Sequence, residues 1–348
     1  MNLRCTCLLT ALLATPLLSV QSQATSSELP SDPAALLSLG HDKNGLDGAN
    51  IRPWHIHGTY HQYGKKGLVE EAGIYEEWRI SPSKYKRMFA GKNFSQIDYA
   101  DGQGLARAGA QDWPSGPEML LRETLIDPLP DPAQWKDFQL VKQSMPVGQT
   151  ALECVAMTYP VRPDLRVNGD TFPTACFDPK IPALRIYSSG SGYRATFDSF
   201  VAFQGHYLPK QVRIFTNGEL MAELTLDTVE GLKDASDTIV APPAEAKPVD
   251  LSVVELKETG KSRIPRALKL AVPVYPQMAK DSHIEGLVVL HGIVGSDGRP
   301  KDLKAVSGPP VLVQPAIDAV AQWIYLPFEV MGEPRTIRME FKVIFRLG

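Results

Sequence analysis

The segment IEGLVVLHGIVGSDGRPKDL (residues 284–303) decides the fold of the C-terminal part of this 348-residue chain. Its run LVVLHGIV is apolar on both faces, and the Asp297-Gly298 pair that follows is a frequent turn signal. The next residues, KDLKAVSG, return as a second strand. We therefore expect an antiparallel hairpin here, close to the end of the chain.

Helical patterns flank this hairpin, and a last strand follows. VPVYPQMAKDSHIEG (272–286) predicts a short helix that stops before Gly286, and PPVLVQPAIDAVAQWIYLPF (309–328) predicts a second helix, closed by Pro327. In TIRMEFKVIFRL (336–347), apolar residues alternate with mostly charged ones, as in an antiparallel strand near a sheet edge. The predicted order is α-β-β-α-β.

This region resembles the C-terminal domain of TonB in four places. Tyr275-Pro276 precedes the first helix, Gly286-Leu287-Val288 opens the strand, Asp297-Gly298 forms the turn, and a Trp-x-Tyr-x-Pro motif at 323–327 ends the second helix. In that family the domain grips a short extended segment, the TonB box, at the periplasmic side of outer-membrane transporters. The family also transmits force from a motor in the inner membrane.

The resemblance implies that this chain binds an extended peptide by strand addition to an exposed sheet edge. The partner would be an outer-membrane TonB-dependent transporter or another periplasmic protein. We expect Trp323 and Tyr325 to belong to the core. The expected partner-binding residues are Tyr275, Pro276, Arg338, Glu340, Lys342, Ile344 and Arg346.

The N-terminus has the pattern of a secretory signal peptide at residues 1–24. One arginine precedes the apolar run from Cys7 to Val20, and Ser22-Gln23-Ala24 provides small residues at the cleavage spacing. This predicts export to the periplasm. An uncleaved segment would instead keep the protein at the inner membrane. TonB itself keeps its membrane helix and has a long Pro-rich arm, so full force transduction is not expected from this chain.

Residues 25–50 are rich in Ser, Pro, Asp and Gly, and we expect a leader loop there. Residues 51–237 contain short aromatic and β-branched runs separated by turn signals, of which Asn217-Gly218 is the strongest. One helix is expected within SGPEMLLRETLIDPLP (115–130), ending at Asp127-Pro128. A Pro/Ala linker at 238–260 then leads to the C-terminal domain at 261–348, so the fold class is α+β.

The stretch GHYLPKQVRIFTNGELMAELTLDTVEGL (205–232) loosely resembles the closing strands of periplasmic carriers of the LolA, LolB and RseB type. Those domains are half-open β-barrels over helices, with an apolar cavity for acyl chains. The resemblance implies a half-barrel-like N-terminal domain that takes a lipid or acyl chain. The aromatic residues that would line its concave face are Trp54, Tyr60, Trp78, Phe89, Phe94, Phe200 and Phe203.

Two cysteines, Cys154 and Cys176, remain after the signal peptide. In an exported chain they are expected to form a disulfide, and the alternative is a pair of buried free thiols. No histidine lies near either cysteine in the sequence, which argues against a metal site there.

Other chemistry is weakly indicated. His55, His57 and His61 share one face of a predicted strand, and His55 with His57 could hold zinc, although a polar outer face is the simpler interpretation. Glu70, Glu71, Glu76 and Glu77 are expected on a solvated face. The formal net charge of −3 and the lack of a basic run disfavour nucleic-acid binding.

The favoured hypothesis is thus a periplasmic peptide-docking protein without enzymatic activity or cofactor. Two alternatives stay open. One is a lipid or lipoprotein carrier or sensor, in which the C-terminal domain positions the cargo domain. The other is a zinc-dependent hydrolase that uses His55 and His57.

Overall fold

The computed structural model describes residues 29–47, 50–114, 116–136, 138–158, 172–189, 192–252, 254–255 and 266–347. The expected signal peptide, residues 1–24, lies outside these ranges. Within them, no helix is long and apolar enough to cross a membrane. The α+β class is confirmed, with a large antiparallel sheet in the N-terminal part and a small α/β unit at the C-terminus.

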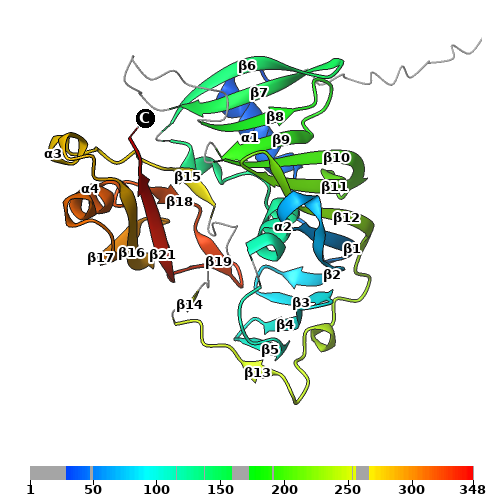
Figure 1. The fold of residues 1–348 in the computed structure, drawn as a ribbon. Helices are drawn as coiled ribbons and strands as arrows, with labels where there is room; N and C mark the ends of the chain where they lie inside the picture. The colour runs from blue at the N-terminus through cyan, green and yellow to red at the C-terminus, as the bar shows by residue number, and fades with distance from the viewer. Residues whose placement is uncertain are drawn as a thin grey trace, which may run out of the picture.

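The large sheet has thirteen strands in the order β13-β5-β4-β3-β2-β1-β12-β11-β10-β9-β8-β7-β6. It curves strongly, with α1 and α2 against its inner side (Figure 1). The strands other than β13 are β1 (Trp54–Tyr63), β2 (Val69–Ser81), β3 (Lys84–Gly91), β4 (Ser95–Asp101), β5 (Leu105–Gly109), β6 (Gln139–Val147), β7 (Thr150–Thr158), β8 (Pro173–Phe177), β9 (Leu184–Ser189), β10 (Tyr193–Phe203), β11 (His206–Thr216) and β12 (Glu219–Gly231).

Short turns generate this meander. Asn217 and Gly218 join β11 to β12 with φ angles of 51° and 83°, a combination that Asn-Gly pairs adopt readily. This confirms the turn predicted from the sequence. A short 3-10 turn, η1 (Lys65–Gly67), separates β1 from β2, and β1 then pairs with β12 to close the central region of the sheet.

Two helices fill the concave side. Helix α2 (Gly116–Ile126) is the predicted one, and it buries Leu120, Leu121 and Leu125. Helix α1 (Pro33–Lys43) lies where a leader loop was expected, so that prediction is wrong. Asp32 caps the N-terminus of α1, and Leu36 and Leu37 are fully buried. The short η2 turn (Pro132–Gln134) follows α2.

The C-terminal unit contains a four-stranded sheet in the order β14-β21-β16-β17. Its main strands are β16 (Gly286–Val294), β17 (Pro300–Ser307) and β21 (Ile337–Phe345), with helices α3 (Gln277–Asp281) and α4 (Pro310–Val320). The predicted hairpin is therefore present. Gly298 has a φ of 73°, and a Cβ there would lie 2.1 Å from the Tyr325 carbonyl oxygen, so the turn requires glycine.

Two features of this unit differ from the prediction. Helix α4 ends at Val320, and the next residues form β18 (Ile324–Tyr325), which pairs with β15 (Ala267–Lys269). A small hairpin then follows, made of β19 (Phe328–Val330) and β20 (Glu333–Arg335). Ile324 thus lies on a strand, although its spacing from Ile317 and Val320 suits a helix.

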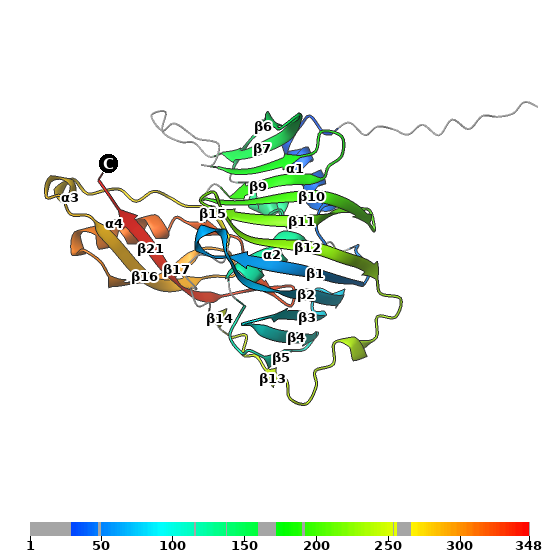
Figure 2. The same ribbon diagram turned by 45° about the vertical axis from the view of Figure 1, so that its right-hand side comes forward.

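The Pro/Ala segment expected as an extended linker is folded onto both sheets. It contains the 3-10 turn η3 (Asp237–Ile239), strand β13 (Lys247–Pro248) and strand β14 (Val254–Glu255). Strand β13 pairs with β5, whereas β14 pairs with β21. This segment follows one side of the large sheet and reaches the small one (Figure 2).

Candidate functional site: a sheet edge and the pocket beside it

Strand β21 pairs with β16 along its whole length, in register from Ile337 opposite Val294 to Phe345 opposite Gly286. Its odd-numbered residues are buried, and the side chains of Arg338, Lys342 and Ile344 are exposed on the other face. The alternation expected from the sequence is therefore present. One side of the strand faces a core, and the other faces solvent.

The second edge of β21 points away from β16. The backbone carbonyl of Thr336 accepts a hydrogen bond from Val254 N at 3.3 Å on this outer edge. Because the N–H and C=O groups of alternate residues point to the same edge, those of Glu340, Lys342 and Ile344 face outward as well. Beyond Arg338, no strand in the described ranges pairs with this edge.

Strand β14 occupies the start of the outer edge. Val254 and Glu255 pair in parallel with Ile337 and Arg338, and the side chain of Val254 is completely buried. The expectation that the docking edge begins at Arg338 is therefore wrong, because the chain itself already pairs there. Arg346 follows the end of β21 and is exposed. Within the described residues, the pairing of β14 with β21 ends at Arg338.

Tyr275 and Pro276 lie where the chain enters α3, and Tyr275 contacts the end of β21. The Tyr275 ring packs edge-on against Phe345 at 5.4 Å, and its hydroxyl donates a hydrogen bond to Ile284 O at 2.7 Å. Pro276 forms the N-cap position of α3. The structure thus places Tyr275 at the C-terminal end of the edge, where it fixes Phe345.

The Trp-x-Tyr-x-Pro motif contributes to the core, as predicted. Trp323 and Tyr325 are buried, and both rings contact Phe341 of β21 at centroid distances of 6.2 and 6.3 Å. Trp323 Nε1 donates to Ala271 O at 2.9 Å. These contacts hold β21 from its buried face, so its outer edge is presented by a rigid support.

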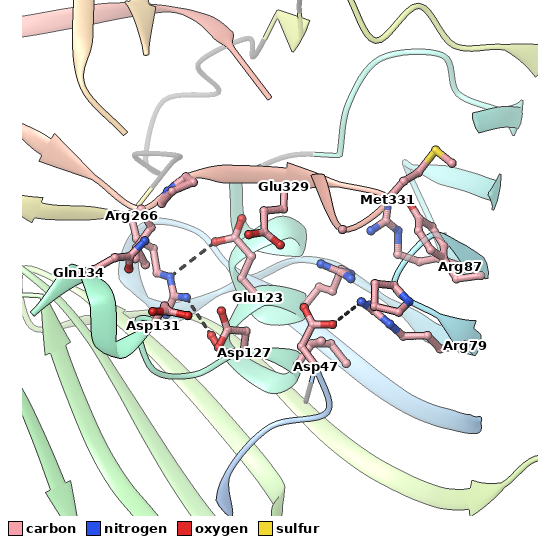
Figure 3. A pocket seen from close by; sticks show the side chains of 17 residues that line it. Asp47, Arg79, Arg87, Glu123, Asp127, Asp131, Gln134, Arg266, Glu329 and Met331 are labelled. Atoms are coloured by element: carbon pink, nitrogen blue, oxygen red, sulfur yellow. Dashed lines mark hydrogen bonds and ion pairs between the residues drawn. The ribbon is translucent and has the colours of Figure 1, made fainter. Parts of the chain in front are cut away.

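A polar pocket lies beside this unit, where it meets the concave face of the large sheet. Asp47, Arg79, Glu123 and Asp127 of the N-terminal part line it together with Arg266 and Glu329 (Figure 3). Arg122 is a further lining residue. Its volume is about 100 Å3. Sequence reasoning missed this site because its charged residues come from distant segments that share no motif.

Burial and neighbouring charges shift the pKa values of two carboxyl groups at this pocket. Burial raises the pKa of Asp127 to about 7, with a further contribution from Asp47, although Arg266 opposes the shift. Burial and the nearby Asp47 and Asp127 raise the pKa of Glu329 to about 7. The pocket therefore contains carboxyl groups that titrate near neutral pH.

The expectation of a solvated face for the acidic cluster is wrong for two of its members. Glu71 and Glu77 are buried, since their side chains point inward from β2. Glu77 accepts hydrogen bonds from Tyr75 and from Arg122 Nε, the latter at 3.2 Å. Burial opposes its ionisation, but Arg122 and Arg79 outweigh burial and lower the pKa of Glu77 to about 2.

The histidines of β1 lie on the outer face of the large sheet, as the alternation predicts. His55 contacts Glu76 and Glu230 at 2.8 and 3.0 Å and stacks on Trp78 at 4.7 Å. His57 contacts Asp227 at 3.2 Å. In the part of the chain that the structure describes, no group of three or more His, Cys, Asp or Glu side chains could hold a metal ion.

The two cysteines are joined. Cys154 on β7 lies directly opposite Cys176 on β8, and a disulfide links them. Both residues are fully buried. The bond therefore ties two neighbouring strands near the β6 end of the large sheet.

The aromatic residues expected on the concave face do not all lie there, because one of them is on the outer face of the large sheet. Trp54, Tyr60 and Phe89 are buried in the core, whereas Trp78 lies on the opposite face with His55. Phe94, Phe200 and Phe203 are partly buried against the core. The inner side is thus filled by α1, α2 and ionised side chains such as Arg107, Asp98 and Glu77.

Comparison with known proteins gives one family match. Residues 271–347 match the family model described as Gram-negative bacterial TonB protein C-terminal. A solved structure of the TonB C-terminal domain from Pseudomonas aeruginosa is 30% identical in sequence to this protein. The match covers 23% of this chain and 84% of the Pseudomonas chain, with a TM-score of 0.19. The resemblance noted in the sequence is confirmed by this family match.

Other solved structures are similar to the N-terminal part. A LolA superfamily protein from Nitrosomonas europaea is 10% identical, with 60% of this chain and 97% of that chain covered and a TM-score of 0.39. MucB is 14% identical over 63% of this chain and 66% of that chain, with a TM-score of 0.30. Comparison with curated protein sequences finds no match.

Proposed function

Because residues 271–347 belong to the TonB C-terminal family, we propose that this protein docks an extended peptide by strand addition to β21. One observation supports the proposal above all. The outer edge of β21 continues beyond Arg338, where pairing with β14 ends, and no other strand in the described ranges joins it there. A guest strand can therefore extend the sheet without unfolding any part of it.

The edge is suited to backbone recognition. Glu340, Lys342 and Ile344 each direct one N–H and one C=O outward. Each hydrogen bond to a guest contributes about 0.5–1.5 kcal/mol net, so a short extended segment can bind at moderate affinity. Glu340, Lys342 and Ile344 also present their side chains on the exposed face beside the guest, which gives a basis for selectivity.

The partner that we propose is a TonB-dependent transporter of the outer membrane, or another periplasmic protein with an extended segment. This places the protein in the periplasm after export through residues 1–24, and gives it no enzymatic role. We further propose two units. The β-rich unit spans 51–237 and also includes the preceding helix α1, and residues 238–260 connect it to a docking unit at 261–348. Docking alone is proposed, without force transduction.

The carrier alternative, with a lipid or acyl chain in the N-terminal unit, has less support. Helices and ionised side chains, including Glu77, Asp98 and Arg107, occupy the concave face of the large sheet. The zinc hydrolase alternative also lacks support, since His55 and His57 each have their own carboxylate contacts. Neither alternative rests on an observation as specific as the outer edge of β21.

The proposal can be tested by titrating fluorescent peptides that carry TonB-box sequences with the full-length exported protein. Fluorescence anisotropy should give saturable binding. Copies of the same peptides with alternate backbone amides methylated should lose affinity by at least tenfold, because they cannot complete the ladder. If methylated and unmethylated peptides bind equally, recognition does not use backbone pairing and the proposal fails.

A further inference from the structure

The polar pocket between the two units holds unlike charges on different sides. Asp47, Arg79 and Arg87 lie together on one side, whereas Glu123 and Asp127 lie on the other (Figure 3). A water molecule needs about 10–15 Å3. The volume of about 100 Å3 therefore leaves room for a small polar molecule that contacts both sides.

The carboxylates of the anionic side stand at the C-terminal end of helix α2, where negative charge is unfavourable. Glu123 lies in the last turn of α2 and Asp127 follows the helix, with Asp127 N donating to Glu123 O at 2.8 Å. This end carries the negative pole of the helix dipole, which destabilises both carboxylates. Like charges four residues apart also repel each other. A cation bound here would offset both effects.

Arg266 supplies part of this positive charge. Its Nη2 donates to Asp127 O at 2.8 Å and its Nη1 to Pro128 O at 3.3 Å, so these groups bind backbone carbonyls. Its Nε lies 3.6 Å from Glu123 Oε2, and this buried atom has no hydrogen-bond partner in the described ranges. Across the described residues, no hydrogen bond or ion pair reaches the carboxylates of Asp127 and Glu329. Both carboxylates are therefore free to bind a ligand.

The pKa values of these carboxyl groups indicate that positive charge is lacking around them. Burial raises the pKa of Glu123, although Arg266 opposes the shift. Burial likewise raises the pKa of Asp127 and of Glu329 to about 7, with Asp47 adding to both shifts. The charged groups that face the three carboxyls are Asp47, Asp131, Arg79, Arg87, Arg122 and Arg266. These arginines do not fully compensate for the burial.

The arginines of the cationic side have unused donors. Arg87 Nη2 donates to Asp98 Oδ2 at 2.6 Å, and Arg122 Nε donates to Glu77 Oε2 at 3.2 Å. Arg122 shares Glu77 with Arg79, which places Arg122 on this side. Within the described ranges, Arg87 and Arg122 make no further hydrogen bonds, and both line the pocket. A guanidinium carries its N–H donors in one plane and binds a carboxylate through two parallel bonds, so a ligand carboxylate fits here.

The site is open to solvent and is built from both units. Three of the lining residues, Asp47, Asp131 and Glu329, are exposed, so a ligand has a path into the pocket in this structure. Arg266 and Glu329 belong to the C-terminal unit, whereas the residues of helix α2 belong to the N-terminal unit. The complete site therefore exists only where the two units meet.

We propose that this pocket is a binding site for a small zwitterion, namely a free amino acid. Its ammonium group binds Asp127 and Glu329. Its carboxylate binds Arg87 and Arg122. An ammonium group is a donor and not an acceptor, which suits carboxylates that have no other partner. An anionic ligand would be repelled by these carboxylates, and a purely cationic one would leave the arginine donors unused. This inference does not depend on peptide docking at β21.

The test is isothermal titration of the full-length protein with alanine, β-alanine, 4-aminobutyrate and 5-aminovalerate, which hold their charges at increasing distances. At least one of them should bind saturably. The N-acetyl and amide forms of that compound each lack one charge. Each should bind at least about tenfold more weakly, because one end loses its charged hydrogen bonds. If none of the four compounds binds, or if either altered form binds as tightly as its parent, the proposal is overturned.

A protein variant tests the anionic side separately. Glu329→Gln keeps the shape of an exposed side chain but removes its charge, so the protein should stay folded and should bind the same compound about tenfold more weakly. The matched control is Glu333→Gln on β20, which is exposed on the same hairpin but does not line the pocket. The affinity of this control should equal that of the wild type. Wild-type affinity in the Glu329→Gln protein contradicts the proposal.

The pH dependence of binding provides a further readout. The carboxyls of Asp127 and Glu329 have pKa values of about 7 in the free protein, and an ammonium group binds their ionised forms. The affinity should therefore rise severalfold between about pH 5.5 and about pH 8, and binding near neutral pH should release protons. Titration in buffers of different ionisation enthalpy detects this release. The rise should be smaller in the Glu329→Gln protein, and an affinity that does not change with pH contradicts the assignment of the ammonium group.

Discussion

Replacing Ile344 with proline should weaken peptide binding while the C-terminal unit stays folded. Ile344 directs its N–H to the outer edge of β21, and its opposite residue on β16 is Leu287. Proline therefore removes no hydrogen bond between β21 and β16. Edge strands tolerate proline at positions whose N–H faces outward.

The size of the effect follows from the same geometry. The substitution removes one outward donor, which is worth about 0.5–1.5 kcal/mol, and its ring also obstructs the neighbouring bond of the guest. With two bonds lost, the expected change is roughly 1–3 kcal/mol, or about 5- to 150-fold in the dissociation constant. The Ile344 side chain is 58% exposed, so its loss should cost little folding stability.

The assay is peptide titration by anisotropy, accompanied by a thermal melt of each variant. Ile344→Ala is the matched control, because it shortens the same side chain but keeps the N–H, and it should bind almost as well as the wild type. Val343→Pro should unfold the unit, since Val343 pairs with Val288 toward β16. If Ile344→Pro is folded and binds with wild-type affinity, the guest does not pair with this edge.

Three further predictions concern other parts of the structure. Val254→Asp should release β14 from β21, because the buried Val254 side chain anchors β14. In the same titration, peptides long enough to reach Ile337 should then bind about 3- to 10-fold more tightly. Shorter peptides should bind with unchanged affinity. Glu77→Gln should destabilise the protein by about 3–5 kcal/mol in urea unfolding, because Arg122 loses its carboxylate partner and Arg79 keeps only Asp47. Since the pKa of Glu77 is lowered to about 2, its contribution is present above pH 4.5 and is lost as the pH falls toward 2, and the variant should lack this loss. Cys154→Ala with Cys176→Ala should cost about 2–4 kcal/mol, and reduction of the wild-type protein should lower its melting temperature to a similar extent.

Local signals were sufficient to predict the small sheet. The Asp297-Gly298 turn, the alternation of β21 and the two proline-bounded helices each depend on neighbouring residues. The end of α4 was less predictable, because Ile324 suits helical spacing equally well. Its strand forms because β15 pairs with it from more than fifty residues away in the sequence, and that contact has no local signature.

The interface between the units was missed for a related reason. Arg107, Trp113, Glu123, Arg266 and Glu329 are ordinary residues in their own segments. The topology alone brings them together, since β2 to β5, α2 and the hairpin converge on one side of the large sheet. Helix α1 was likewise hidden in a polar stretch, although the cap at Asp32 and the adjacent Leu36 and Leu37 were visible signals.

The edges of the two sheets bear on the proposal that β21 is a docking strand. Unprotected edges promote aggregation, so proteins cover or interrupt them. Strand β13, with Pro248, covers β5, and β6 carries Pro146. Two register shifts interrupt the pairing of β17 with β16. By contrast, β21 has no proline and pairs with β16 without any shift, while β14 covers just its first two residues. The charged Arg338, Glu340 and Lys342 discourage indiscriminate pairing at this edge, whereas its regular backbone still matches the geometry of a specific extended peptide.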